Sequence, residues 1–290
     1  MSREENIKIF EDTVALCRSN QILMQSVQSS CQSQRLILEG DSVPNGADPA
    51  AVPRFEEPAQ IVISKKRTFE AARFYAGKGD KVCVLNFASA SNPGGGVVNG
   101  SGAQEECLCR VSTLYFCLDI DQNWKKFYRP HRAARSPIHN DDIIYTRDVM
   151  VIKTDTASPK LMPESEWYKT DVITCAAPNL RESPSNRYNC GDGAERLLLS
   201  DSELEAVHQK RDRRIFDVAV QNKVDVLILG AFGCGAFRNN PAVVAKVMLG
   251  LACEYQHQFK VIEFAVYCRF DDDENYRAFE VEKLVGEQPA

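Results

Sequence analysis

The sequence contains no uninterrupted apolar run of about 18 residues, the length that a membrane-spanning helix requires. Its first residues, MSREENIKIFEDT, are charged and include no apolar core of a secretory signal peptide. Basic charge is not in excess either, since the formal net charge is -5, and this argues against a surface built for duplex nucleic acid. These absences predict a cytoplasmic or otherwise intracellular protein with no membrane partner and no sequence-specific nucleic-acid partner.

Clusters of cysteine and histidine at metal-ligand spacing are also missing. The 11 cysteines are odd in number and lie mostly in apolar runs such as KVCVLNF and DVITCAAP, which favours buried, reduced thiols over disulfides. Cys107 and Cys109 form a CxC pair, but no second pair accompanies it at zinc spacing. We therefore interpret the pair as packing residues on a helix and expect neither a metal nor a cofactor.

What the sequence does contain is the composition of an ordinary globular protein, with 44% hydrophobic and 26% charged residues over 290 positions. Short apolar, β-branched runs start near residues 61, 82, 149, 171, 224 and 261. Helical patterns alternate with them at 68–77, 104–118, 194–221 and 241–258. This alternation predicts an α/β fold with three layers, in which helices flank both faces of a sheet.

The chain divides into two predicted parts. Residues 1–57 have helical spacing of apolar residues near the start and a loop rich in Gly, Pro, Asn and Asp near the end, which indicates an N-terminal helical cap and linker. Residues 58–290 then form the domain that carries the sheet. Within it, residues 119–145 are polar, aromatic and basic without a clear period, and we expect a long surface loop there.

The segment LNFASASNPGGGVVNGSGAQEECLCR, residues 85–110, places an apolar strand before a glycine-rich loop and a helix. Gly94, Gly95 and Gly96 allow the backbone to adopt positive φ and to approach a bound group closely. Strand ends in open α/β sheets commonly open onto a ligand crevice. The alternative is a flexible surface loop without a ligand.

Gln104, Glu105 and Glu106 follow this loop at the expected start of a helix. Carboxylates in a first helical turn are stabilised by the helix dipole by about 0.3–1 kcal/mol, so a purely structural role is a serious alternative. Adjacent helical residues point about 100° apart, so Glu105 and Glu106 cannot share one face. We expect one to hold hydroxyl groups of a ligand and the other to transfer protons.

A second glycine-rich junction, VDVLILGAFGCGAFRNNP, covers residues 224–241. Backbone N–H groups of such a turn can bind a diphosphate without basic side chains, although no GK[ST] or first-strand GxGxxG fingerprint is present. Phe237 is interpreted either as an aromatic that stacks on a sugar or base or as core packing. Cys234 has no evident histidine partner, so a small loop residue is favoured over a nucleophile.

Three glycines, seven intervening residues and QEE resemble the signature of the poly(ADP-ribose) glycohydrolases, in particular the compact microbial type built on a macrodomain. The segments NFASASNPGGG, ITCAAPN and LGAFGCGAFRNNP resemble that family in the same order, over roughly residues 60–270. The resemblance implies a macrodomain-like mixed sheet and cleavage of the ribose–ribose O-glycosidic bonds of poly(ADP-ribose), with release of ADP-ribose.

The same resemblance implies roles for individual residues. Glu106 matches the catalytic glutamate that acts as both acid and base, and Glu105 matches its partner that bonds ribose hydroxyls. Asn92 and Phe237 match residues beside the distal ribose. Binding contacts are implied for the remaining loop positions, Gly94, Gly95, Gly96, Gln104, Gly233, Cys234, Gly235 and Ala236. The implied partners are poly(ADP-ribose), ADP-ribose and ADP-ribosylated proteins.

Two other functions fit the same sequence. Macrodomains also bind ADP-ribose without cutting it, and others remove single ADP-ribosyl units from proteins. Hydrolysis of the polymer that depends on Glu106 distinguishes the glycohydrolase from both. A second catalytic carboxylate is not evident, so the sequence leaves retention and inversion of configuration open.

Overall fold

The computed structural model describes residues 1–48, 51–186, 191–268 and 272–286. Its centre is a seven-stranded sheet in the order β1-β4-β5-β3-β6-β7-β2. The strands are β1 (Arg35–Ile37), β2 (Gln60–Ser64), β3 (Val82–Phe87), β4 (Ile143–Val151), β5 (Tyr168–Cys175), β6 (Val226–Leu229) and β7 (Val261–Ala265). Neighbours from β5 to β2 are parallel, whereas β4 is antiparallel to both β5 and β1. The predicted mixed sheet is confirmed.

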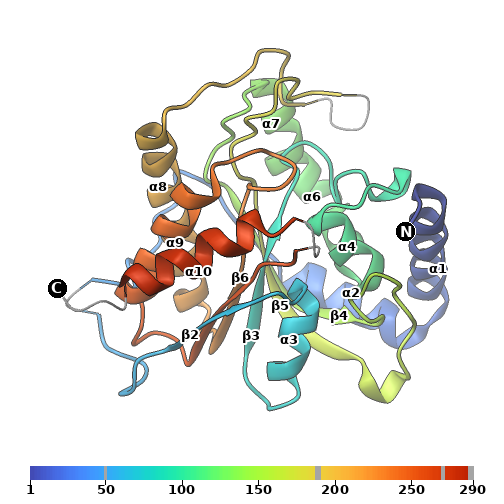
Figure 1. Ribbon diagram of the computed structural model, residues 1–290. Coiled ribbons are helices and arrows are strands. Elements are labelled where there is room, and N and C mark those ends of the chain that lie inside the picture. The colour runs from blue at the N-terminus through green and yellow to red at the C-terminus, as the bar shows by residue number, and fades with distance from the viewer. Residues whose placement is uncertain (49–50, 187–190, 269–271, 287–290) are drawn as a thin grey trace.

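Helices cover both faces of this sheet, which gives the three predicted layers (Figure 1). One layer contains α8 (Asp201–Gln221), α9 (Pro241–Glu254) and α10 (Glu274–Gly286), and the other contains α3 (Thr68–Ala76), α4 (Gln104–Val111) and α5 (Leu114–Leu118). Side chains that alternate along β3 explain the arrangement, because Val84 belongs to a core with Phe69 of α3 and Leu85 to a core with Phe216 of α8. Every strand of the centre is thus buried on both faces.

The predicted N-terminal helical extension is present as α1 (Arg3–Ser19) and α2 (Gln21–Ser33). A capping box between Ser2 and Glu5 fixes the start of α1. The helix packs against the α4–α5 region, where the Phe10 and Tyr115 rings meet edge to face with centroids 5.0 Å apart. Strand β1 follows α2 and forms the edge of the sheet beside β4. The division of the chain at residue 57 stays a prediction.

The predicted surface loop at 119–145 was wrong. This stretch folds into α6 (Asp121–Asn123), a π-helical segment η2 (Trp124–Tyr128) and α7 (Arg129–Ala134), and β4 begins at Ile143. Phe127 and Tyr128 are fully buried. A π-helical turn spaces its apolar residues differently from the 3.6-residue period, so this segment has no helical periodicity in its sequence.

The helix boundaries differ from the predicted ranges by up to seven residues. The helix predicted over 104–118 is interrupted at Ser112, which bridges to Val151, and the one predicted from 194 begins at Asp201. Two short 3₁₀ helices, η1 (Val97–Asn99) and η3 (Glu164–Glu166), complete the elements. Among the helices of the described residues, none has the length and apolarity to cross a membrane.

Candidate active site

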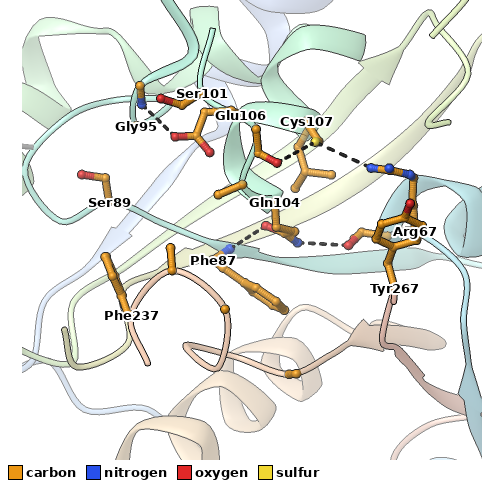
Figure 2. Close-up of a pocket in the computed structure, with 18 of the residues that line it drawn as sticks. Arg67, Phe87, Ser89, Gly95, Ser101, Gln104, Glu106, Cys107, Phe237 and Tyr267 are labelled. Carbon is orange, nitrogen blue, oxygen red and sulfur yellow. Dashed lines mark hydrogen bonds between the residues drawn. The ribbon is translucent and has the colours of Figure 1, made fainter. Parts of the chain in front are cut away.

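A cavity of about 710 Å³ lies at the carboxyl ends of the parallel strands. Its lining includes Ser89 just after β3, Ala231 just after β6 and Tyr267 just after β7. The first glycine loop and the second glycine loop face each other across it, with Glu106 on one side and Phe237 on the other (Figure 2). Ligands of open α/β sheets bind at this edge, and the volume suits a small molecule.

The first glycine loop closes around the carboxylate of Glu106. Gly95 has a φ of 56°, in the left-handed region. A Cβ atom at this position would lie 2.6 Å from Oε1 of Glu106. The next residue, Gly96, donates its backbone N–H to the same oxygen over 2.9 Å. Glycine at position 95 is therefore required both by the backbone conformation and by the space that the carboxylate occupies.

Glu106 lies in the first turn of α4, lines the cavity and is only 7% exposed. Its Oε2 atom is buried and has no hydrogen-bond partner within the described ranges. Burial raises the pKa of Glu106, and the hydrogen bond from Gly96 and the charge of Arg110 oppose this shift only in part. A carboxyl group in this state keeps its proton to a higher pH than an exposed glutamic acid.

Glu105, its neighbour, points into the protein. Oε2 accepts a hydrogen bond from the Ser89 backbone N–H over 2.8 Å, and Oε1 accepts one from Asn86 Nδ2 over 3.2 Å. Its burial, together with the charge of Glu106, raises the pKa of Glu105 well above the ordinary value. Glu105 is absent from the cavity lining and connects α4 to the end of β3. The two carboxylates therefore face different surroundings, and the difference in their roles stays a prediction.

Gln104 lines the cavity, but its side chain is fully engaged within the protein. Oε1 accepts the backbone N–H of Phe87 over 2.9 Å, while Nε2 donates to the carbonyl of Leu85 and to Thr68 Oγ1. This amide therefore connects α4 to the end of β3. It places the first turn of α4, and with it Glu106, beside the cavity.

The buried side chain of Asn239 stabilises the second glycine loop. Its Nδ2 donates to the carbonyls of Pro178 and Gly233, and its Oδ1 lies 2.8 Å from His208 Nε2. Gly233 has a φ of 80°, and a Cβ atom there would lie 2.7 Å from that of Ala177. The loop is thus held in one conformation by contacts that only glycine at position 233 permits.

Most of the predicted residues of the second loop line the cavity. Gly233, Gly235, Ala236 and Phe237 do so, with Phe237 half-buried beneath the Arg181 guanidinium at 5.8 Å. Cys234 is buried outside the lining, and burial raises the pKa of its thiol. This environment disfavours the thiolate that a nucleophile requires.

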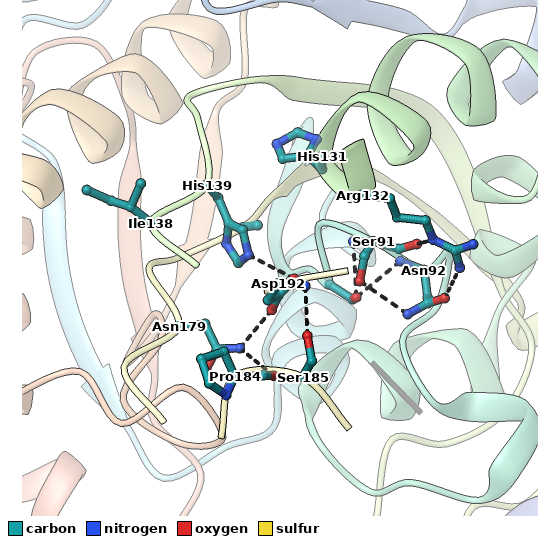
Figure 3. A network of polar contacts seen from close by, with 12 residues as sticks. Ser91, Asn92, His131, Arg132, Ile138, His139, Asn179, Pro184, Ser185 and Asp192 are labelled. Carbon is teal, nitrogen blue, oxygen red and sulfur yellow. Dashed lines mark hydrogen bonds and ion pairs between the residues drawn. The ribbon is translucent and has the colours of Figure 1, made fainter. Parts of the chain in front are cut away.

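Asn92 and Gly94 of the first loop lie outside the cavity lining. Asn92 Nδ2 donates to Ser91 Oγ, and its Oδ1 accepts from the Arg132 guanidinium (Figure 3). Its backbone carbonyl accepts the N–H of Gly95 over 3.0 Å. Asn92 therefore shapes the turn that leads to Gly95 and Glu106.

The amino-terminal half of the chain matches a known protein family. Residues 4–154 match the model of the microbial-type PARG catalytic domain, where PARG stands for poly(ADP-ribose) glycohydrolase. The chain belongs to this family. It is a glycosidase that hydrolyses the ribose–ribose O-glycosidic bonds of poly(ADP-ribose) and releases ADP-ribose. The match begins at residue 4 and so includes both N-terminal helices.

Solved glycohydrolase structures resemble the whole chain. The enzyme from Thermomonospora curvata is 29% identical with a TM-score of 0.81, and the comparison covers 96% of this chain and 99% of that one. The enzyme from Deinococcus radiodurans in complex with ADP-ribose is 30% identical with a TM-score of 0.71, covering 89% and 97%. A comparison with curated proteins finds no match.

Several lining residues of this glycohydrolase were not foreseen from the sequence. They include Arg67, Phe87, Ser89, Arg181 and Tyr267. Phe87, Ser89 and Tyr267 stand at or directly after strand ends, a position that could have identified them. Arg67 and Arg181 reach the cavity only through tertiary contacts, such as the 3.9 Å approach of the Arg67 guanidinium to the Tyr267 ring.

Proposed function

We propose that the cavity binds the terminal ADP-ribose unit of poly(ADP-ribose) and that Glu106 is the acid and base that cleaves its glycosidic bond. The observation that carries this proposal is that Glu106 lines the cavity and that its buried Oε2 has no hydrogen-bond partner in the described part of the chain. Burial raises the pKa of this carboxyl group, as a general acid requires. Asp155 also lines the cavity, but its Oδ2 accepts the Phe69 backbone N–H.

In the proposed reaction, Glu106 gives its proton to the departing ribose oxygen while the bond from that oxygen to the anomeric carbon breaks. Positive charge develops on the sugar as an oxocarbenium-like centre. The glutamate, now a carboxylate, takes a proton from the water that attacks the anomeric carbon. The reaction ends with two hydroxyl groups and a reprotonated Glu106, so one residue serves both steps.

The two glycine loops provide the proposed binding contacts. We expect Gly95 and Gly96 to contact the distal ribose, and Gly233, Gly235 and Ala236 to surround the diphosphate with backbone groups. Gly94 and Cys234 lie outside the cavity lining and are expected to shape the two loops instead. Oriented backbone N–H groups bind anions without basic side chains, which suits a chain whose net charge is -5. Phe237 is the aromatic side chain that would orient the distal ribose. Relatives have been solved with ADP-ribose and with the inhibitor ADP-HPD, which supports ADP-ribose as the ligand of the cavity.

Glu105, Gln104 and Asn92 are proposed to act mainly by position. Glu105 holds the loop after β3 against α4, and Gln104 bonds the end of β3. Asn92 bonds Arg132 of α7. The direct contact of Glu105 and Asn92 with ribose hydroxyls stays a prediction. So do ADP-ribosylated proteins as carriers of the polymer, and an intracellular location.

The pH dependence of the reaction provides a test of the acid. Since burial raises the pKa of Glu106, the protonated form that cleavage needs is present below this raised pKa and is lost as the pH rises through it. We therefore expect kcat/KM to fall on the alkaline side, with a limb above the ordinary glutamate pKa of about 4.3. A rate that stays constant from pH 5 to about pH 9 would be inconsistent with Glu106 as the acid.

Replacing Asn239 tests the support of the diphosphate loop. Asn239→Ala removes the donors to Pro178 and Gly233 and the oxygen next to His208 Nε2. We expect the free energy of unfolding to fall by about 1–3 kcal/mol and the affinity for ADP-ribose to decrease. Urea denaturation and calorimetric titration measure the two quantities. Unchanged affinity in the folded variant would separate Asn239 from the binding loop.

Release of ADP-ribose tests the function itself. Purified protein is incubated with labelled poly(ADP-ribose), and free ADP-ribose is separated by chromatography over time. Monomeric ADP-ribose that accumulates with time supports the proposal. Binding of ADP-ribose without any release from the polymer would refute it.

A further inference from the structure

The segment that contains η2 and α7 carries positive charge that the proposed catalytic site does not use. Residues 122–140 include five Lys and Arg residues and neither Asp nor Glu, in a chain with a net charge of -5. Four of the five are exposed, namely Lys125, Lys126, Arg129 and Arg135. We call these four side chains the basic surface.

None of these four side chains forms a salt bridge with the described part of the chain. Some exposed cations elsewhere have partners, as Lys210 pairs with Glu39 and Lys246 with Glu205. The backbone beneath the basic surface is fixed by burial of Phe127, Tyr128 and His131. Its charge is therefore presented to solvent on a well-packed segment.

The fifth cation, Arg132, connects this segment to the proposed active site. Its Nε donates to the Ser91 carbonyl over 2.7 Å, and its terminal nitrogen donates to Asn92 Oδ1 (Figure 3). Asn92 in turn accepts the N–H of Gly95, the residue that touches the Glu106 carboxylate. The segment that carries the basic surface is thus hydrogen-bonded, through Arg132, to the loop that leads to Gly95 and Glu106.

An aromatic side chain accompanies the charge. Trp124 is half-buried, and the Arg132 guanidinium lies 4.8 Å from its ring centroid. Its Nε1–H donates to Asp119 Oδ1 over 2.7 Å, which fixes the orientation of the ring. The segment thus carries an aromatic ring with an arginine over it as well as four exposed cations. Cations and aromatic rings together are what proteins use to bind a flexible, phosphate-bearing strand that contains bases.

We infer that the basic surface binds the part of poly(ADP-ribose) beyond the terminal unit, through the diphosphates of the following units. The inference rests on the proposed function, which places the terminal unit in the cavity. A polymer leaves the site on the side of the departing ribose and carries a diphosphate in each unit. Exposed Lys and Arg side chains without salt bridges, on the segment that Arg132 connects to the first glycine loop, provide positive charge that complements these diphosphates.

The test measures affinity for polymer and for free ADP-ribose in the Glu106→Gln background, so that substrate is not consumed. The triple substitution Lys125→Gln, Lys126→Gln, Arg129→Gln is expected to weaken binding of long poly(ADP-ribose) by about five- to tenfold at low salt. Affinity for ADP-ribose should change by less than about twofold, since the cavity is untouched. The slope of log K against log salt should become shallower by up to about 2 for the polymer alone.

A matched control removes three exposed charges elsewhere, by Arg35→Gln, Lys169→Gln and Lys223→Gln, none of which lines the cavity. An equal loss of polymer affinity in the control overturns the inference, because net charge alone would then explain it. Equal losses of affinity for polymer and for ADP-ribose overturn the inference as well. So does a triple variant that binds single-stranded RNA more weakly than the wild type but binds the polymer equally well.

A second measurement does not depend on whether the triple variant folds. It compares how steeply the affinities for polymer and for ADP-ribose fall with salt in the protein without the triple substitution. Polymer binding that is no steeper in salt than ADP-ribose binding contradicts the inference. Failure of the proposed function has a different signature, since the wild type would then release no ADP-ribose from the polymer. Normal release with unchanged polymer affinity in the triple variant rejects only the basic surface.

Discussion

Glu106→Gln is expected to lower kcat for polymer hydrolysis by about 10²–10⁴-fold, because the amide can neither give nor take the proton in the transition state. The substitution keeps the shape of the side chain, and the Gly96 N–H that now bonds Oε1 can still bond the amide oxygen. Affinity for ADP-ribose should therefore change by less than about threefold. Chromatography of released ADP-ribose gives kcat, and calorimetric titration gives the affinity.

Asp155→Asn is the matched control for this substitution. Asp155 also lines the cavity, is buried to the same extent as Glu106, and has a pKa raised by burial. Its carboxylate accepts the Phe69 N–H at the start of α3 and so has a structural task. We expect kcat of this variant to stay within about tenfold of the wild type. Equal losses in the two variants would assign the effect to cavity integrity, and full activity of Glu106→Gln would exclude it as the acid.

The sequence predicted the layers of the fold well, because the central strands are buried on both faces. Runs such as VCVLNF and DVITCAA are continuous and β-branched, and this signal survives without tertiary information. Strand β1 was missed because its three residues, Arg35–Ile37, pair only at the sheet edge. Segment 119–145 was missed because a π-helical turn breaks the period that identifies a helix.

The sequence predicted the two loops of the site, but it predicted the roles of their side chains only in part. Glycine spacing located both loops, since a strand followed by glycines and a helix is a local pattern. The sequence could not show that Gln104 bonds the end of β3, or that Arg132 holds Asn92, because these contacts join separate elements. Both glutamates lie in the first turn of α4, where stabilisation of the helix start and catalysis are the two alternative roles that the sequence leaves open.

Gly95→Ala is expected to lower kcat by on the order of 10²-fold, the effect of misplacing a catalytic group by about 1 Å. The new Cβ atom would lie 2.6 Å from Oε1 of Glu106 and must push the carboxylate away from its position. The φ of 56° adds strain for any residue other than glycine. Because the displaced group is catalytic, the loss should appear mainly in kcat, measured by release of ADP-ribose under saturating polymer.

Gly235→Ala in the second loop is the control for Gly95→Ala. It shows how much an alanine that lines the cavity, but does not contact Glu106, changes kcat. Gly235 also lines the cavity, but a Cβ atom there meets no heavy atom within 4 Å, and its φ lies outside the left-handed region. We expect its kcat to stay within about threefold of the wild type, with any change confined to KM. If Gly95→Ala shows no larger loss of kcat than Gly235→Ala, the close approach of Gly95 to Glu106 has no catalytic consequence. A loss confined to Gly95→Ala means that the backbone of the first loop sets the position of the proton that Glu106 transfers.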